Sequence, residues 1–182
     1  MQQFSNILII VFVLGLSACS LTPVYEKSRY NNGLNHILRA YEDTVSRAHA
    51  DSNRSWQNGR LGNLTVNLEG GTNVGLCYHW QEIVYVGIQK SVKTTGWRAV
   101  GIAINEGNFL EHHAVLVYDP KQLKFSQIMD KRFGSKSYVL DPWKSGKPLV
   151  YTLDNWLTLA VSIENQPRLT KVERFRLTGH KP

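Results

Sequence analysis

The 182-residue chain is predicted to fold as one α+β domain, with helices first and strands of a mostly antiparallel sheet afterwards. In the N-terminal half, apolar residues recur every three or four positions, which is typical of amphipathic helices. In the C-terminal half, short runs rich in Val, Ile and aromatic residues are separated by turns, which is typical of strands. Helices and strands that are segregated along a chain favour the α+β class. A composition of 42% hydrophobic and 19% charged residues excludes disordered, collagenous and coiled-coil chains.

Two amphipathic helices are predicted before residue 97. The first spans residues 34–48, and its apolar stripe consists of Leu34, Ile37, Leu38, Tyr41, Val45 and Ala48. The second begins at Cys77 and continues to about Val92, with Gly96 as its expected end. The Asn-, Gly- and Ser-rich stretch 51–63 and the GGTNVG segment that starts at Gly70 are expected to be loops.

Five strands are predicted after Gly96, and turn sequences such as NEGN, DPK and KSGK separate them. They are WRAVGIAI from Trp97, HHAVLVY from His112, LKFSQIM from Leu123, YVLD from Tyr138 and PLVYT from Pro148.

The N-terminus is predicted to be a targeting segment. Residues 7–16 read ILIIVFVLGL, an uncharged apolar run of signal-peptide length that is too short to span a membrane. The LSAC sequence that ends at Cys19 resembles the lipobox of bacterial lipoproteins. The alternatives are an ordinary secretory signal or an apolar start without a targeting role.

The lipoprotein resemblance implies three segments. Residues 1–18 would be a cleaved signal peptide, residues 19–32 a lipidated tether, and residues 33–182 the folded domain. Cys19 would carry the lipid and bind outer-membrane lipid, because Ser20, which is not Asp, permits sorting to the outer membrane of the bacterial envelope. Several acyl chains on one cysteine anchor a protein stably.

Cys77 is the candidate nucleophile. If Cys19 is lipidated, Cys77 has no cysteine with which to form an intramolecular disulfide. A cysteine in the first turn of a helix lies at the positive end of the helix dipole, which stabilises a thiolate. The alternative is a buried cysteine that acts as a small hydrophobic residue.

A thiolate used for acyl transfer needs an imidazole and a third group that orients it. The HHAVLVY strand supplies the imidazole. Since side chains alternate between the two faces of a strand, His112 and His113 cannot both point to the site. We select His113 as the base, although a slip of one residue in register would exchange it for His112. Asp141, at the end of the YVLD strand, is the expected orienting group.

The sequences GLCYHW, HHAVLVYD and YVLDPW, in this order, resemble the transglutaminase-like branch of the papain-like cysteine proteinases. The resemblance covers roughly residues 70–145 and implies a papain-like fold in which N-terminal helices pack on the sheet. It implies Cys77 as nucleophile, His113 as general base and acid, and Asp141 as orienting group. The papain-like pattern has a Gln before the Cys. Here Asn73 or the backbone N–H of Cys77 is the candidate oxyanion donor.

The remaining candidates concern shielding, metals and partners. Trp143 is expected to shield the triad from water. Two histidines and a carboxylate can hold zinc, but the spacing of His79, His112, His113 and Asp119 matches no metal motif, so neither a metal nor another cofactor is expected.

Nothing resembles a nucleic-acid motif. The net charge is +7, and the C-terminal cations are expected either to contact an anionic envelope surface or to protect an exposed edge strand; they include Arg168, Lys171, Arg174 and Arg176.

The expected function is thiol-dependent acyl transfer by a lipid-anchored envelope protein that faces the periplasm or the cell surface. Its substrate would be an amide of a protein or of a peptidoglycan peptide. Water would make the protein a peptidase or amidase, and an amine would make it an acyltransferase. The alternative from another class is a catalytically inactive lipoprotein that uses the same fold to bind a partner and keeps Cys77 as a packed residue.

Overall fold

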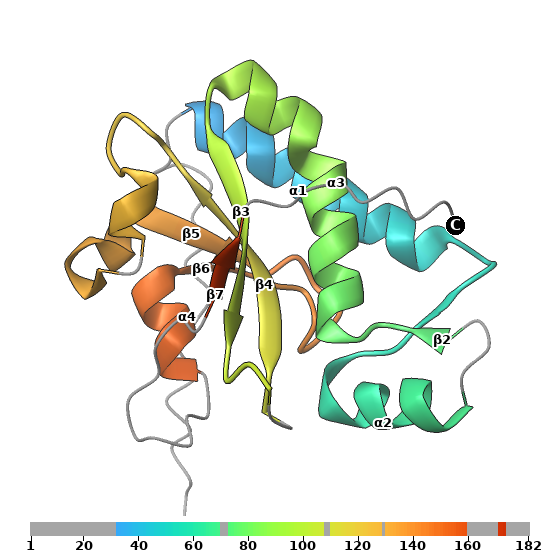
Figure 1. Cartoon of the computed structure of the whole chain (residues 1–182). Helices are drawn as coiled ribbons and strands as arrows, with labels where there is room; N and C mark the ends of the chain where they lie inside the picture. Colours follow the sequence, from blue (N-terminus) through green and yellow to red (C-terminus); the bar gives the residue numbers. More distant parts are fainter. Residues whose placement is uncertain (1–31, 70–72, 108–109, 129, 160–170, 174–182) are drawn as a thin grey trace, which may run out of the picture.

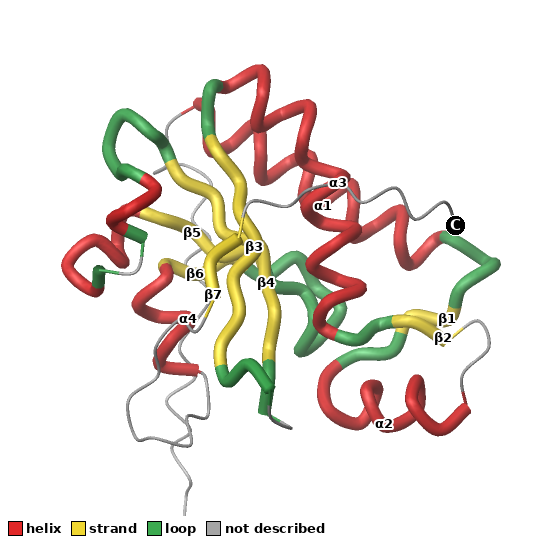
Figure 2. The backbone as a smooth tube through the Cα atoms, in the orientation of Figure 1, coloured by secondary structure: helices red, strands yellow, loops and turns green. Residues whose placement is uncertain are grey.

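The computed structural model describes residues 32–69, 73–107, 110–128, 130–159 and 171–173, and within them the fold is α+β, as predicted. Two long helices cover one face of an antiparallel sheet, and a short helix lies on the other face (Figures 1 and 2). The elements are α1 (Asn32–Ala50), β1 (Ser55–Trp56), α2 (Gly59–Glu69), β2 (Asn73–Val74), α3 (Cys77–Thr95), β3 (Arg98–Ile104), β4 (His112–Tyr118), the 3-10 helices η1 (Phe125–Gln127) and η2 (Lys131–Lys136), β5 (Ser137–Leu140), β6 (Val150–Thr152), α4 (Leu153–Leu159) and β7 (Lys171–Glu173).

Helices α1 and α3 confirm the two predicted amphipathic helices. The predicted stripe of α1 is buried against α3 and the sheet, together with Val115 and Val117 of β4. At Gly87 the two helices approach so closely that a Cβ atom there would lie 2.1 Å from Oγ1 of Thr44. Helix α3 ends at Gly96, as predicted, with a left-handed φ of 74°.

The sheet has the strand order β6-β5-β4-β3-β7, and all its described pairs are antiparallel. The even-numbered residues of β4 from Ala114 to Tyr118 pack on the face opposite α1 and α3, in a cluster that includes Leu153 and Trp156 of α4. Four of the five predicted strands are therefore confirmed as β3, β4, β5 and β6.

The predicted strand at LKFSQIM is wrong. Leu123 and Ile128 are buried, but the backbone between them forms η1, with Ile128 N–H donating to the oxygen of Phe125. Gln127 stands where an alternating strand needs an apolar residue, and its side chain accepts a hydrogen bond from the Lys124 backbone N–H at 2.9 Å. This side-chain contact favours the turn over a strand.

The prediction that residues 51–63 form a loop is also wrong in part, because α2 begins at Gly59. Gly59 N–H donates to the backbone oxygen of Trp143 at 2.8 Å, which fixes the start of α2. A Cβ atom on Gly62 would lie 2.9 Å from Gln57. Helix α2 therefore depends on contacts with distant residues and on a glycine of low helix propensity.

The N-terminal predictions lie outside the described residues: the apolar run 7–16, Cys19 and almost all of the tether. Arg168, Arg174 and Arg176 lie outside them as well, whereas Lys171 belongs to β7, at one edge of the sheet as described. Within the described ranges, no helix combines the length and the apolar character needed to cross a membrane.

Candidate functional site

The start of α3 positions Cys77, which is only 5% exposed. Leu76 is the N-cap residue of this helix, and no side chain in the described part of the chain caps it. The first helical backbone bond runs from Trp80 N–H to the oxygen of Leu76. The backbone N–H groups of the first turn, which begins at Cys77, therefore contribute the positive end of the helix dipole at the sulfur.

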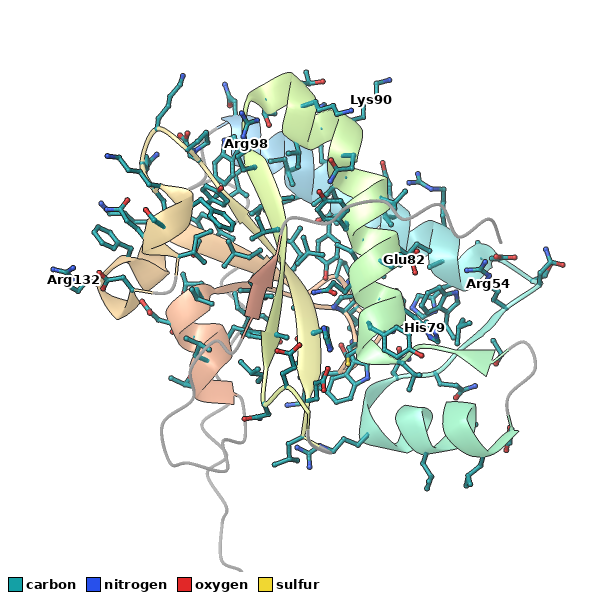
Figure 3. The ribbon with its side chains drawn as sticks, viewed as in Figure 1. Arg54, His79, Glu82, Lys90, Arg98 and Arg132 are labelled. Carbon is teal, nitrogen blue, oxygen red and sulfur yellow. The ribbon has the colours of Figure 1, made fainter. Side chains whose placement is uncertain are left out.

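Gly75 fixes the approach of the chain to Cys77. It has a φ of 125°, and a Cβ atom there would lie 2.0 Å from the backbone oxygen of Gln57. Its N–H donates to Nδ1 of His79 at 3.2 Å, so His79 supports the turn before Cys77 and lies outside the predicted triad. Burial lowers the pKa of His79 and nearby Arg54 lowers it further, while Glu82 opposes them. Figure 3 shows these three side chains near the start of α3.

Gly75→Ala is expected to destabilise the fold by about 3 kcal/mol, because it adds both backbone strain and a clash with Gln57. Gly96→Ala is the matched control. Its φ is also positive, but no described atom lies within 4 Å of its added Cβ, so it should cost only about 1 kcal/mol. Urea denaturation measures both changes. Equal losses would contradict the packing role given to Gly75.

His112 and Asp141 form the central contact of the site. Nε2 of His112 lies 2.7 Å from Oδ2 of Asp141, and both side chains are largely buried. The Cys77 side chain is close enough to the same imidazole to raise its pKa. The other ring nitrogen, Nδ1, is buried and has no hydrogen-bond partner among the described residues. The Cys77 thiol instead donates to the backbone oxygen of Glu111, over a long distance of 4.0 Å.

His112, and not His113, is the histidine that lies beside Asp141, so His112 replaces His113 as the candidate base. In the sheet, Leu116 pairs with Val139 and Val115 with Leu140. Continuing this register by one residue puts Asp141 opposite Ala114, so its side chain lies on the face that Ala114 shares with His112. His113 points to the other face, where its Nε2 contacts Oε1 of Glu111.

Burial and charge act in opposite directions on this pair. Burial alone lowers the pKa of His112, but the Asp141 carboxylate and the Cys77 side chain outweigh it and raise that pKa to about 10. Burial raises the pKa of Asp141, but the His112 imidazole and the hydrogen bonds from Trp156 and Trp143 outweigh it, so the net shift is downward. The geometry therefore favours an ionised carboxylate beside a protonated imidazole.

Two indole rings enclose the pair. The ring of Trp143 lies 4.4 Å from that of His112, in agreement with its predicted shielding position, and the ring of Trp156 lies 5.5 Å away. Trp156 also donates from Nε1 to Oδ2 of Asp141 at 2.8 Å, and the Trp143 backbone N–H donates to Oδ1 at 3.2 Å. The role of Trp156 was not predicted from the sequence. Its spacing from Leu153 and Leu157 was the available indication of α4.

Gln81 is a second residue that sequence reasoning missed. It lies one turn after Cys77, and its buried Nε2 donates to the backbone oxygens of Ile102 at 3.1 Å and Ala114 at 2.7 Å. These two bonds hold the first turns of α3 against β3 and against β4 two residues after His112. Gln81 therefore fixes the helix that positions the thiol relative to the strand that positions the imidazole.

Two further predicted site residues, Asn73 and Asp119, lie in or beside strands. Asn73 is in β2, where it pairs with Ser55 of β1. Asp119 follows the end of β4 that is distant from His112. The described residues contain no group of three or more His, Cys, Asp or Glu side chains that could hold a metal ion.

Comparisons with protein-family models, with curated proteins and with solved structures found no match to this chain.

Proposed function

We propose that this protein is a cysteine peptidase or amidase of the transglutaminase-like type, with a papain-like fold, anchored by lipid in the bacterial envelope. The catalytic part is supported by the arrangement of Cys77, His112 and Asp141. Nε2 of His112 lies 2.7 Å from the Asp141 carboxylate, and the same imidazole interacts electrostatically with Cys77, the first residue of a long helix. Acyl transfer by a thiol requires these three groups in this relation.

The ionisation of His112 supports a thiolate nucleophile. With a pKa of about 10, the imidazole carries a positive charge at neutral pH. That charge and the N-terminal dipole of α3 both favour negative charge on the sulfur of Cys77. Nε2–H of His112 donates to the Asp141 carboxylate, and this bond fixes the orientation of the ring. The other ring nitrogen, Nδ1, is then the atom that can exchange a proton with the thiol.

The reaction then follows from the positions of these atoms. Sγ of Cys77 attacks the carbonyl carbon of an amide while Nδ1 of His112 holds the thiol proton. As the C–N bond breaks, Nδ1–H donates that proton to the leaving amine, and a thioester remains. Water, deprotonated by Nδ1, then attacks the thioester, which releases a carboxylic acid and restores the thiol. If an amine attacks in place of water, the acyl group is transferred to that amine. The backbone N–H of Cys77 is the oxyanion donor that the chain offers at the sulfur.

The envelope anchor is the second part of the proposal. It is supported by the LSAC sequence at residues 16–19 and by the polar segment that follows Cys19. Protein or peptidoglycan-peptide amides are the substrates that such a location offers.

A covalent thioester tests the catalytic part. The full chain is incubated with p-nitrophenyl acetate, and the acetylated residue is located by mass spectrometry. We expect rapid acetylation of Cys77 that hydroxylamine reverses, and no acetylation at this position in Cys77→Ser. Release of nitrophenol that is as fast in Cys77→Ser as in the parent protein, or acetylation confined to lysines, would overturn the proposal.

A non-catalytic binding module on the same fold is the second candidate. It is favoured by the 5% exposure of Cys77, since a packed sulfur needs no access for substrate. The same experiment separates the two candidates, because a packed cysteine reacts only after the protein is unfolded.

A further inference from the structure

The end of the domain opposite the candidate site is defined by the register of the sheet. Ile104 pairs with His112 at the end where Cys77 and Asp141 lie, whereas Arg98 pairs with Tyr118 at the other end. Helix α3 runs between the two ends, since it starts at Cys77 and stops at Thr95, immediately before β3. Its 19 residues correspond to about 27 Å.

This opposite end is basic. Five exposed cations belong to it, and we call them the basic end: Lys90, Lys93, Arg98, Lys121 and Lys124. The chain has no acidic residue between Glu82 and Glu106. Asp119 is the nearest acid to Lys121 along the chain, and its carboxylate accepts hydrogen bonds from the backbone of Lys121 and the side chain of Gln122. Figure 3 shows Lys90 and Arg98 together at the upper end of the domain.

The N-terminal segment joins the domain at the same end. Helix α1 begins at Asn32, and Figure 1 shows this start beside the last turn of α3 and the first residues of β3. Cys19 precedes Asn32 by 13 residues, which reach at most about 45 Å when extended. A lipid attached to Cys19 would therefore be joined to the domain at its basic end, within reach of the bilayer.

We propose that the basic end lies on an anionic lipid bilayer, with lysine and arginine side chains paired to headgroup phosphates. The Cys77 end then faces away from the bilayer, toward substrates in the aqueous compartment. The orientation rests on the lipid anchor of the proposed function, but the affinity of the surface for anionic lipid does not. Each cation near such a surface contributes about fivefold to the partition coefficient.

Vesicle sedimentation tests this surface. The protein is the full chain with Cys19→Ser, so that no acyl group contributes, and the vesicles are phosphatidylglycerol with phosphatidylcholine, or phosphatidylcholine alone. The measured quantity is the partition coefficient on the phosphatidylglycerol-containing vesicles divided by that on phosphatidylcholine alone, both at low salt. Any apolar contribution of the N-terminus is common to both coefficients and cancels in this ratio. We expect a ratio well above one that falls at least about 25-fold in Lys121→Glu/Lys124→Glu.

Lys144→Glu/Lys147→Glu is the matched control, because both lysines are exposed and follow Asp141 at the other end of the domain. We expect this control to lower the ratio less than about threefold. A ratio near one for the parent protein, or equal losses in the two double variants, would overturn the proposal. Failure here leaves the thioester experiment unaffected, because that experiment contains no membrane.

Discussion

His112→Ala is expected to lower the alkylation rate of Cys77 at pH 6.5 by about tenfold or more, whereas His113→Ala should change it less than about threefold. Without the imidazolium, the sulfur should react as an ordinary thiol, of which only about 1% is thiolate two units below a pKa of ~8.5. The lower nucleophilicity of a stabilised thiolate offsets part of this hundredfold difference. Iodoacetamide labelling followed by intact mass measures all three rates.

His113→Ala is the control for position, since its imidazole contacts Glu111 on the other face of β4. If His113→Ala produced the larger loss, the assignment of His112 would be wrong, and the register argument would fail with it. Circular dichroism of each variant confirms that the comparison is made between folded proteins.

Asp141→Ala is expected to destabilise the protein by about 3–5 kcal/mol. It leaves the buried His112 without its anion and removes the acceptor of the Trp156 indole N–H. Asp43→Ala, an exposed carboxylate on α1, is the control and should change the unfolding free energy by less than about 0.5 kcal/mol. Urea denaturation at pH 6 measures both, and similar small losses would contradict the buried ion pair.

The same pair predicts how this loss depends on pH. The pKa of His112 is raised to about 10, so its contribution is complete below its unfolded value of ~6.5 and is lost as pH rises toward 10. The pKa of Asp141 is lowered, so its contribution is present above its unfolded value of ~3.9 and is lost at lower pH. The difference between wild type and Asp141→Ala should therefore be largest between about pH 4 and 6.5. A difference that grows above pH 7 would contradict the account.

The parts of the fold that were predictable are those in which one face of an element is buried. The stripes of α1 and α3 meet each other and the sheet, so their spacing alone located both helices. Helix α2 and η1 were not predictable in this way. The start of α2 depends on Trp143, more than 80 residues away, and η1 depends on a hydrogen bond from the Lys124 backbone N–H to the Gln127 side chain.

The candidate site was predictable to within one residue. The position of Cys77 followed from the helix that it begins, and Asp141 from the strand that it ends. The choice between His112 and His113 depends on which residue of β4 lies opposite Asp141, and no single strand contains that information. Trp156 and Gln81 act through contacts between distant elements, so their types alone did not indicate their roles.

The rate of Cys77 alkylation in the wild-type protein, followed from pH 4 to pH 10, tests most directly whether Cys77 and His112 form a reactive pair. We expect fast reaction that persists at least two pH units below the range of an ordinary thiol and does not fall until the pair is disrupted by acid. A rate that declines tenfold per pH unit below ~8.5, or no reaction until the protein is unfolded, would contradict the reactive pair and favour the binding module.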